Sequence, residues 1–102
     1  MVYKNIYAMS DYRLYQERAK AQLDEWEADL DKFRAKARQR ETEDKIDLEA
    51  KIRDLEEKLE KGKARYKELK ESGESAWKSL KEGMDAARND LDKAFKEAKS
   101  KF

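Results

Sequence analysis

Apolar side chains recur at alternating spacings of three and four residues along three consecutive stretches of the chain. In the first stretch Gln16 is the one polar position, and such spacing puts all members on one face of a helix, as in a coiled coil. Ser10 followed by Asp11 is typical of a helix N-cap. We therefore expect a helix from about residue 10, preceded by an N-terminal arm at residues 1–9. The positions are Met9, Tyr12, Gln16, Ala19, Leu23, Trp26, Leu30, Phe33 and Ala37.

The second and third stretches follow the same rule. The second consists of Leu48, Ile52, Leu55, Leu59, Gly62, Tyr66 and Leu69. The third consists of Trp77, Leu80, Met84, Ala87, Leu91, Ala94 and Ala98, and is widened by Phe95 and Phe102. A wide stripe of this kind predicts a helix, at about residues 75–101, that packs against more than one neighbour.

The segment between the first two stretches has two interpretations. Ala37 and Leu48 are eleven residues apart, which is not a multiple of seven. The basic "KARQR" followed by the acidic "ETED" would suit a turn near residues 40–45, because these charges complement the dipoles of an ending and a beginning helix. The segment has no Gly, Pro or Asn, which favours one continuous helix with a four-residue insertion in its repeat. We favour the continuous helix, over residues 10–71.

A turn is predicted between the second and third stretches. Gly73 follows a lysine-rich segment and suits a backbone with positive φ, while Ser75, or alternatively Ser72, suits the N-cap of the last helix. The expected fold is all-α: one domain, residues 1–102, in which a long coiled-coil helix is covered by a shorter helix folded back as an antiparallel hairpin. The alternative is a three-helix bundle with turns near residues 41 and 73.

Self-association is expected from this architecture. The shorter helix can cover only part of the long one, so the end that carries Trp26 and Phe33 would need a partner chain, and we expect a homo-oligomer. The large side chains of the three stretches are then candidate core and oligomer contacts. They are Leu23, Trp26, Leu30, Phe33, Leu48, Ile52, Leu55, Leu59, Tyr66, Leu69, Trp77, Leu80, Met84, Leu91 and Phe95, with Ser72, Gly73 and Ser75 as turn residues.

Composition narrows the function. Of 102 residues 48% are charged, but 25 basic side chains balance 24 acidic ones, which argues against a nucleic-acid partner. The chain has no Cys and no His, so thiolate and imidazole ligands or bases are missing. We find no phosphate loop, nucleophile elbow or metal-ligand motif, and we expect no enzyme activity, no cofactor and no metal. No secretory leader is recognisable, so a cytoplasmic location is expected.

Two segments carry a resemblance. Gln22-Leu23-Asp24-Glu25-Trp26 and the Ser72-to-Gly83 segment resemble small, single-domain bacterial coiled-coil proteins of about this length. The resemblance covers most of the chain after about Tyr12 and implies helical hairpins with apolipoprotein-like amphipathic helices. It implies no catalytic residue, and the aromatic-rich opening "MVYKNIYAMSDY" departs from the family pattern.

The leading functional hypothesis is a non-enzymatic scaffold or spacer that self-associates and binds another helical protein. The alternative is reversible binding to a membrane surface, suggested by four lysines that flank the last stripe: Lys78, Lys81, Lys96 and Lys99. The N-terminal arm is interpreted as a partly docked helix end, with a partner-binding arm that uses Val2, Tyr3, Ile6 and Tyr7 as the alternative.

Overall fold

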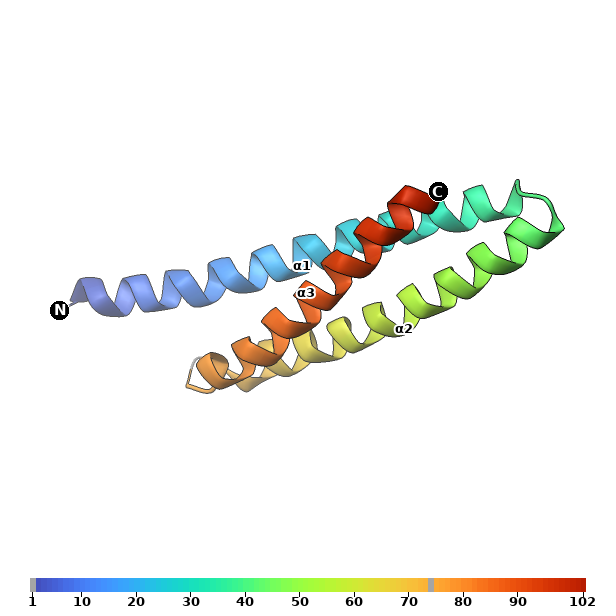
Figure 1. The fold of residues 1–102 in the computed structure, drawn as a ribbon. Helices are drawn as coiled ribbons and strands as arrows, with labels where there is room; N and C mark the ends of the chain where they lie inside the picture. The colour runs from blue at the N-terminus through green and yellow to red at the C-terminus, as the bar shows by residue number, and fades with distance from the viewer. Residues whose placement is uncertain (1, 74) are drawn as a thin grey trace.

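Three helices make up the fold (Figure 1). They are α1 (Val2–Arg38), α2 (Thr42–Ser72) and α3 (Trp77–Lys101). The structure is a computed structural model that describes the backbone of residues 2–73 and 75–102, and the side chains of residues 11–73 and 75–102. No strand occurs in the described part, so the all-α prediction is confirmed.

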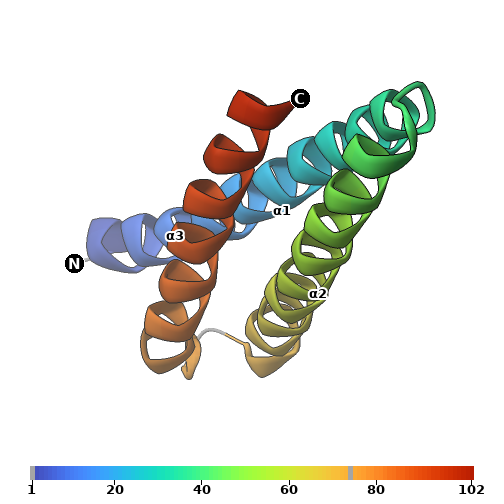
Figure 2. The ribbon, with the colours of Figure 1, turned by 45° about the vertical axis from the view of Figure 1, so that its right-hand side comes forward.

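The helices form a long, narrow bundle. α1 and α2 make an antiparallel hairpin, and α3 turns back along α2 while crossing over α1 (Figures 1 and 2). The molecule measures 62 × 18 × 17 Å along its principal axes. The first turns of α1 extend past the α2–α3 turn, and the α1–α2 turn extends past the end of α3 (Figure 1). The shorter α3 therefore covers the middle of the hairpin.

The predicted continuous helix over residues 10–71 is wrong, and the alternative three-helix bundle describes the chain. α1 ends at Arg38, where the Gln39 and Arg40 N–H groups donate to the carbonyls of Lys36 and Ala37, both at 3.1 Å. Glu41 is the N-cap of α2, and its carbonyl accepts a hydrogen bond from the Lys45 N–H at 2.8 Å. The last turn of α1 thus tightens before the chain reverses.

The physical reason for the break is the burial that it allows. Glu41 has φ −73° and ψ 164°, an extended conformation that any residue adopts, so the reversal needs no Gly, Pro or Asn. Lys36 and Arg38 in the last turn of α1, and Glu43 and Asp44 in the first turn of α2, complement the two helix dipoles. The reversal lets the apolar faces of α1 and α2 cover each other, and this burial outweighs the cost of interrupting the helix.

A proline substitution at the start of α2 tests whether the chain turns there or continues as one helix. We expect Thr42→Pro to leave the free energy of unfolding unchanged or to raise it by about 0.5 kcal/mol, because Pro suits the first position of a helix and extended Glu41 suits the residue before Pro. The control Arg53→Pro, in the exposed middle of α2, should lower it by about 3 kcal/mol. Urea unfolding followed by circular dichroism measures both, and an equal loss for the two variants would contradict the turn.

The start of α1 also differs from the prediction. The helix begins at Val2, so residues 2–9 continue α1 and Ser10 lies inside the helix instead of capping it. The segment contains no Gly or Pro that would end a helix before Ser10. The side chains of Val2, Tyr3, Ile6 and Tyr7 lie outside the described residues.

The turn between α2 and α3 is where it was predicted, but one cap differs. Gly73 follows α2 with φ 74° and ψ −179°, a conformation that only Gly adopts without strain, and the Ser72 hydroxyl donates to the Leu69 carbonyl at 2.8 Å. The N-cap of α3 is Ala76, without a side-chain cap, so the prediction of Ser75 as the cap is wrong. The helix begins one residue later because Ser75 and Ala76 both belong to the turn.

The core is a single cluster to which all three helices contribute. Its aromatic part joins α1 to α3: Trp26 and Phe33 stack on Phe95 with ring centroids 5.9 and 6.0 Å apart, and Phe33 stacks on Phe102 at 4.5 Å. The expectation that the Trp26 and Phe33 end needs a partner chain is therefore wrong. The break near Glu41 shortens the hairpin enough for α3 to cover this end from within the same chain.

Among the described side chains, four ion pairs link the helices at the surface of this core. Arg34 pairs with Glu56 at 3.2 Å and Lys63 with Glu27 at 2.8 Å, between α1 and α2. Lys51 of α2 pairs with Glu97 at 3.6 Å, and Lys99 pairs with Asp29 of α1 at 3.5 Å. Partly exposed pairs of this kind contribute at most about 1 kcal/mol each to the free energy of unfolding. Their main effect is to favour one register between neighbouring helices.

Gly62 lies where α2 packs closely against side chains of both other helices. A Cβ at this position would be 2.7 Å from Leu91 Cδ1 of α3 and 3.2 Å from Leu23 Cδ2 of α1. Both leucines are buried and cannot move into solvent. Gly83, in contrast, has room, since a Cβ there would lie 3.8 Å from Arg65 Cδ and Nε, an ordinary contact distance. Gly62 is thus required for close helix packing, and Gly83 is not.

Alanine at these two glycines should have opposite effects. Gly62→Ala should lower the free energy of unfolding by about 1–3 kcal/mol, because the overpacking exceeds the gain in helix propensity. Gly83→Ala should raise it by about 1 kcal/mol, which is the propensity gain without the clash. Thermal and urea unfolding measure both, and stabilisation by Gly62→Ala would contradict the close approach.

Candidate functional site

The residues predicted as core and oligomer contacts lie inside one chain. All are buried except Tyr66, Trp77 and Leu80, which are partly buried against the same core. These side chains thus form the core within one chain. A second molecule would have to use another surface, and two such surfaces stand out.

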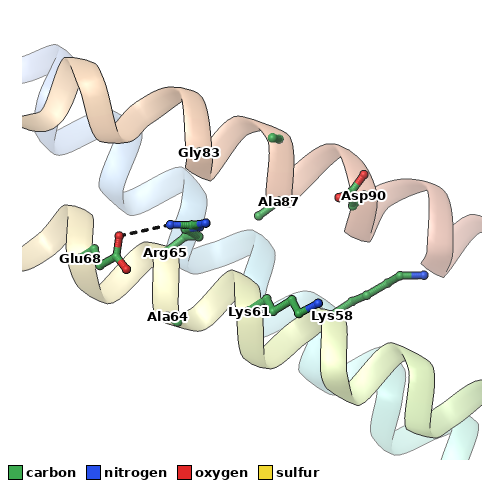
Figure 3. Close-up of a pocket in the computed structure, with 9 residues that line it drawn as sticks. Lys58, Lys61, Ala64, Arg65, Glu68, Gly83, Ala87 and Asp90 are labelled. Carbon is green, nitrogen blue, oxygen red and sulfur yellow. Dashed lines mark ion pairs between the residues drawn. The ribbon is translucent and has the colours of Figure 1, made fainter.

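The first is a groove between α2 and α3 on the side away from α1, with a volume of about 580 Å³ (Figure 3). We call it the α2–α3 groove. Its apolar lining consists of small residues: Ala64, Gly83, Ala86 and Ala87. Its charged rim consists of Lys58, Lys61, Arg65, Glu68 and Asp90.

The charges on this rim are only partly paired. Lys58 pairs with Asp54 at 2.9 Å, and Arg65 pairs with Glu68 at 3.5 Å. Lys61 and Asp90 form no ion pair within the described side chains. Lys61 is on α2 and Asp90 is on α3, and the two lie toward the same end of the groove (Figure 3). The groove thus offers one cation and one anion to a partner.

The second surface is a polar and aromatic cluster between α1 and α3, which we call the Tyr15 cluster. It consists of Tyr15, Gln22, Trp77, Lys81, Asp85 and Arg88. The Tyr15 hydroxyl donates to Asp85 Oδ1, and the Arg88 Nε–H donates to Gln22 Oε1 at 2.7 Å. Lys81 Nζ and Arg88 Cζ lie 5.4 and 5.5 Å from the centre of the Tyr15 ring, within range of cation–π attraction.

A neighbouring tyrosine ties this cluster to the end of α2. The Tyr12 hydroxyl donates to the Leu69 carbonyl at 3.0 Å, and its ring lies 5.7 Å from that of Trp77. Leu69 is in the last turn of α2, where carbonyls lack helical partners. Tyr12 and Tyr15 together therefore hold α1 against both ends of the α2–α3 turn.

The environment of Tyr15 changes its acidity. Partial burial, followed in size by the hydrogen bond to Asp85, raises the pKa of Tyr15 to about 12, although the nearby Arg88 opposes the shift. A pKa raised in the folded state means that the neutral phenol stabilises the fold. That contribution is complete below the ordinary tyrosine pKa of 10.0 and is lost as the pH rises toward 12.

Ultraviolet titration can detect this tyrosine directly. In the native protein one phenol should ionise near pH 12, and this step should be missing in Tyr15→Phe. The stability difference between the two proteins should be largest below pH 10 and should shrink between pH 10 and 12. A Tyr15 that ionises at or below pH 10 would show that the hydroxyl is not held by Asp85.

Among the described residues, no group of three or more acidic, Cys or His side chains is placed to hold a metal ion. No described helix is long and apolar enough to cross a membrane.

No protein-family model, curated protein or solved structure matches the chain significantly. The resemblance to small bacterial coiled-coil proteins therefore stays a prediction, and the function has to be argued from the structure itself.

Both surfaces were missed by reasoning from the sequence. Ala64 and Ala86 lie outside the apolar stripes, so the periodicity did not mark them as the lining of a groove. Tyr15 lies beside the first stripe, and its partner Asp85 resembled any other solvent-exposed acid. A signal was present, however: Ala64, Gly83, Ala86 and Ala87 are small residues that would face each other once α2 and α3 are paired in antiparallel.

Proposed function

We propose that this protein is a non-enzymatic interaction module that self-associates through the α2–α3 groove and uses helix packing to bind a protein partner. The observation that carries the proposal is the groove itself, with its small-residue lining and with Lys61 and Asp90 at its rim, which form no ion pair with any described side chain. The apolar stripes of the helices are buried within the chain, so this groove is the best remaining surface for a second molecule.

Symmetry explains why a second copy fits the groove. A twofold axis parallel to the groove would put α2 of one copy opposite α3 of the other and would keep the same end of the groove aligned. Lys61 of each copy would then face Asp90 of the other, forming two equivalent ion pairs. The four helices at the interface would each lie antiparallel to their neighbours, as in an ordinary four-helix bundle.

The lining of the groove favours close packing of these helices. Helix axes in contact are about 8–10 Å apart, and the shorter distances require small side chains at the interface. Ala64 and Ala86 are exposed, and Gly83 and Ala87 are half-buried. Covering them with a second pair of helices would bury apolar surface without displacing any core residue.

Reversible binding to a lipid surface has less support. The apolar face of α3 would have to contact the membrane, but Met84, Leu91 and Phe95 on that face are buried in the core. α3 would have to leave the bundle first and would lose the stacking of Phe95 on Trp26 and Phe33. Self-association through the groove requires no such opening.

Charge reversal at the groove tests the proposed dimer. Sedimentation equilibrium at micromolar to millimolar concentrations should give twice the chain mass of 12.1 kDa for the native protein. Lys61→Glu and Asp90→Lys should each weaken the dimer by about tenfold or more, because each places two pairs of like charges at the interface. The double variant should restore it, since both ion pairs form again with their charges exchanged.

A matched control separates the groove from general charge effects. Lys32→Glu makes the same charge change on an exposed position of α1, and should leave the dimer unaffected. A native protein that remains monomeric at millimolar concentration would refute self-association. A dimer that is weakened equally by Lys32→Glu and Lys61→Glu, or that the double variant does not restore, would place the interface elsewhere.

A further inference from the structure

The Tyr15 cluster opens into a surface pocket of about 400 Å³ at the end of the bundle where α3 begins. Its lining consists of Asp11, Leu14, Tyr15, Arg18, Trp77, Lys81 and Arg88. The pocket lies on α1 and α3 only, whereas the α2–α3 groove lies on α2 and α3. It is therefore a separate surface, and what it binds does not depend on the dimer.

Cationic side chains outnumber carboxylates around this pocket. Among the described side chains, Arg18, Lys81 and Arg88 line it, and Asp11 is the one carboxylate in the lining. Asp85 accepts the hydrogen bond of the Tyr15 hydroxyl and pairs with two of these cations, since Lys81 Nζ is 3.7 Å and Arg88 Nη1 is 4.0 Å from its oxygens. The described side chains around the pocket thus carry three positive charges and two negative ones. A ligand with one negative charge would neutralise the remaining positive charge.

Arg88 is held in place for such a ligand. Its Nε–H is committed to Gln22 Oε1, and its guanidinium group lies against the ring of Tyr15. A guanidinium that is already fixed loses little side-chain entropy when it binds an acid group. Arg18 is one helical turn from Leu14 and Tyr15, is exposed and lines the same pocket, so it is available to bind the same acid group.

The remaining lining is apolar and aromatic. Trp77 lies 6.0 Å from Tyr15, ring centre to ring centre, and Leu14 is 45% exposed, one of the two large aliphatic side chains most open to solvent in the described part. A volume of about 400 Å³ is near the lower end for ligand pockets. It suits a small molecule and is too small for a second folded domain.

We propose that this pocket binds a small organic anion: one carboxylate that pairs with Arg18 and Arg88, attached to an aromatic ring or short alkyl chain that contacts Trp77 and Leu14. The pairing of the guanidinium groups with the carboxylate orients the ligand in the pocket, and the apolar contacts supply most of its binding affinity. The hydroxyl of Tyr15 remains bonded to Asp85 and serves to hold the cluster together.

Trp77 reports on this pocket, while Trp26 is buried in the core and serves as an internal control. A proton–nitrogen correlation spectrum resolves the two indole N–H signals, and Trp77→Phe assigns them. Phenylbutyrate and octanoate should each be titrated, with the uncharged phenylbutyramide as the matched control. We expect one or both acids to shift the Trp77 signal to saturation at millimolar concentration, while the Trp26 signal stays in place and the amide has no effect.

Two charge variants on the same helix make the test specific. Arg18→Gln should weaken binding of the acid by about tenfold, since a charge-assisted pair is lost. Arg13→Gln removes the same charge from an exposed position that does not line the pocket, and should change the affinity by less than about twofold. Binding by both acids points to any apolar carboxylate, and binding by phenylbutyrate alone to an aromatic one.

Three results would overturn the proposal. They are a Trp77 signal that neither acid shifts, an amide that binds as well as its acid, and equal losses for Arg18→Gln and Arg13→Gln. The same acids are also titrated into Lys61→Glu, which changes the groove and leaves the pocket intact. This separates binding of the acid in the pocket from formation of the dimer.

Discussion

The packing of the three helices depends on Gly62, a position in α2 that has no side chain. At Gly62 the backbone of α2 comes so close to Leu91 of α3 and Leu23 of α1 that an added Cβ would lie 2.7 and 3.2 Å from their side chains. Any larger residue would push α3 outward and separate it from α1. The aromatic stacking of Phe95 on Trp26 and Phe33, and the polar contacts around Tyr15, all require α3 to lie at this distance.

The two interfaces of α3 are built in different ways. Against α1 it uses large aromatic rings and long polar side chains, which keep the two backbones apart and give the contact its specificity. Against α2 it uses Gly62 and small residues, which let the helices approach closely and leave a groove on the outer side. The candidate sites follow from this difference: a pocket among long side chains on one side of α3 and a small-residue groove on the other.

Much of this arrangement could be predicted from the periodicity of the sequence. The apolar stripes gave the helical class and nearly all core residues, since burial follows the spacing of three and four. The turn at Gly73 was predictable because its positive φ favours glycine. The turn at Glu41 was not, because it uses ordinary backbone angles and is stabilised by contacts between distant parts of the chain. The α2–α3 groove depends on which faces of α2 and α3 meet, and the Tyr15 pocket depends on which faces of α1 and α3 meet. Neither pairing can be read from periodicity alone.

The placement of the polar contacts has a consequence for the order of folding. The α1–α2 and α2–α3 hairpins each join neighbours in sequence, so either can close with little loss of chain entropy. The bonds from Tyr15 to Asp85 and from Arg88 to Gln22 connect residues 70 and 66 positions apart, and they can form only after both hairpins are in place. α3 should therefore close on α1 last and detach from it first. Formation of the contact between α1 and α3, which creates the Tyr15 pocket, is then also the last step in folding of the bundle.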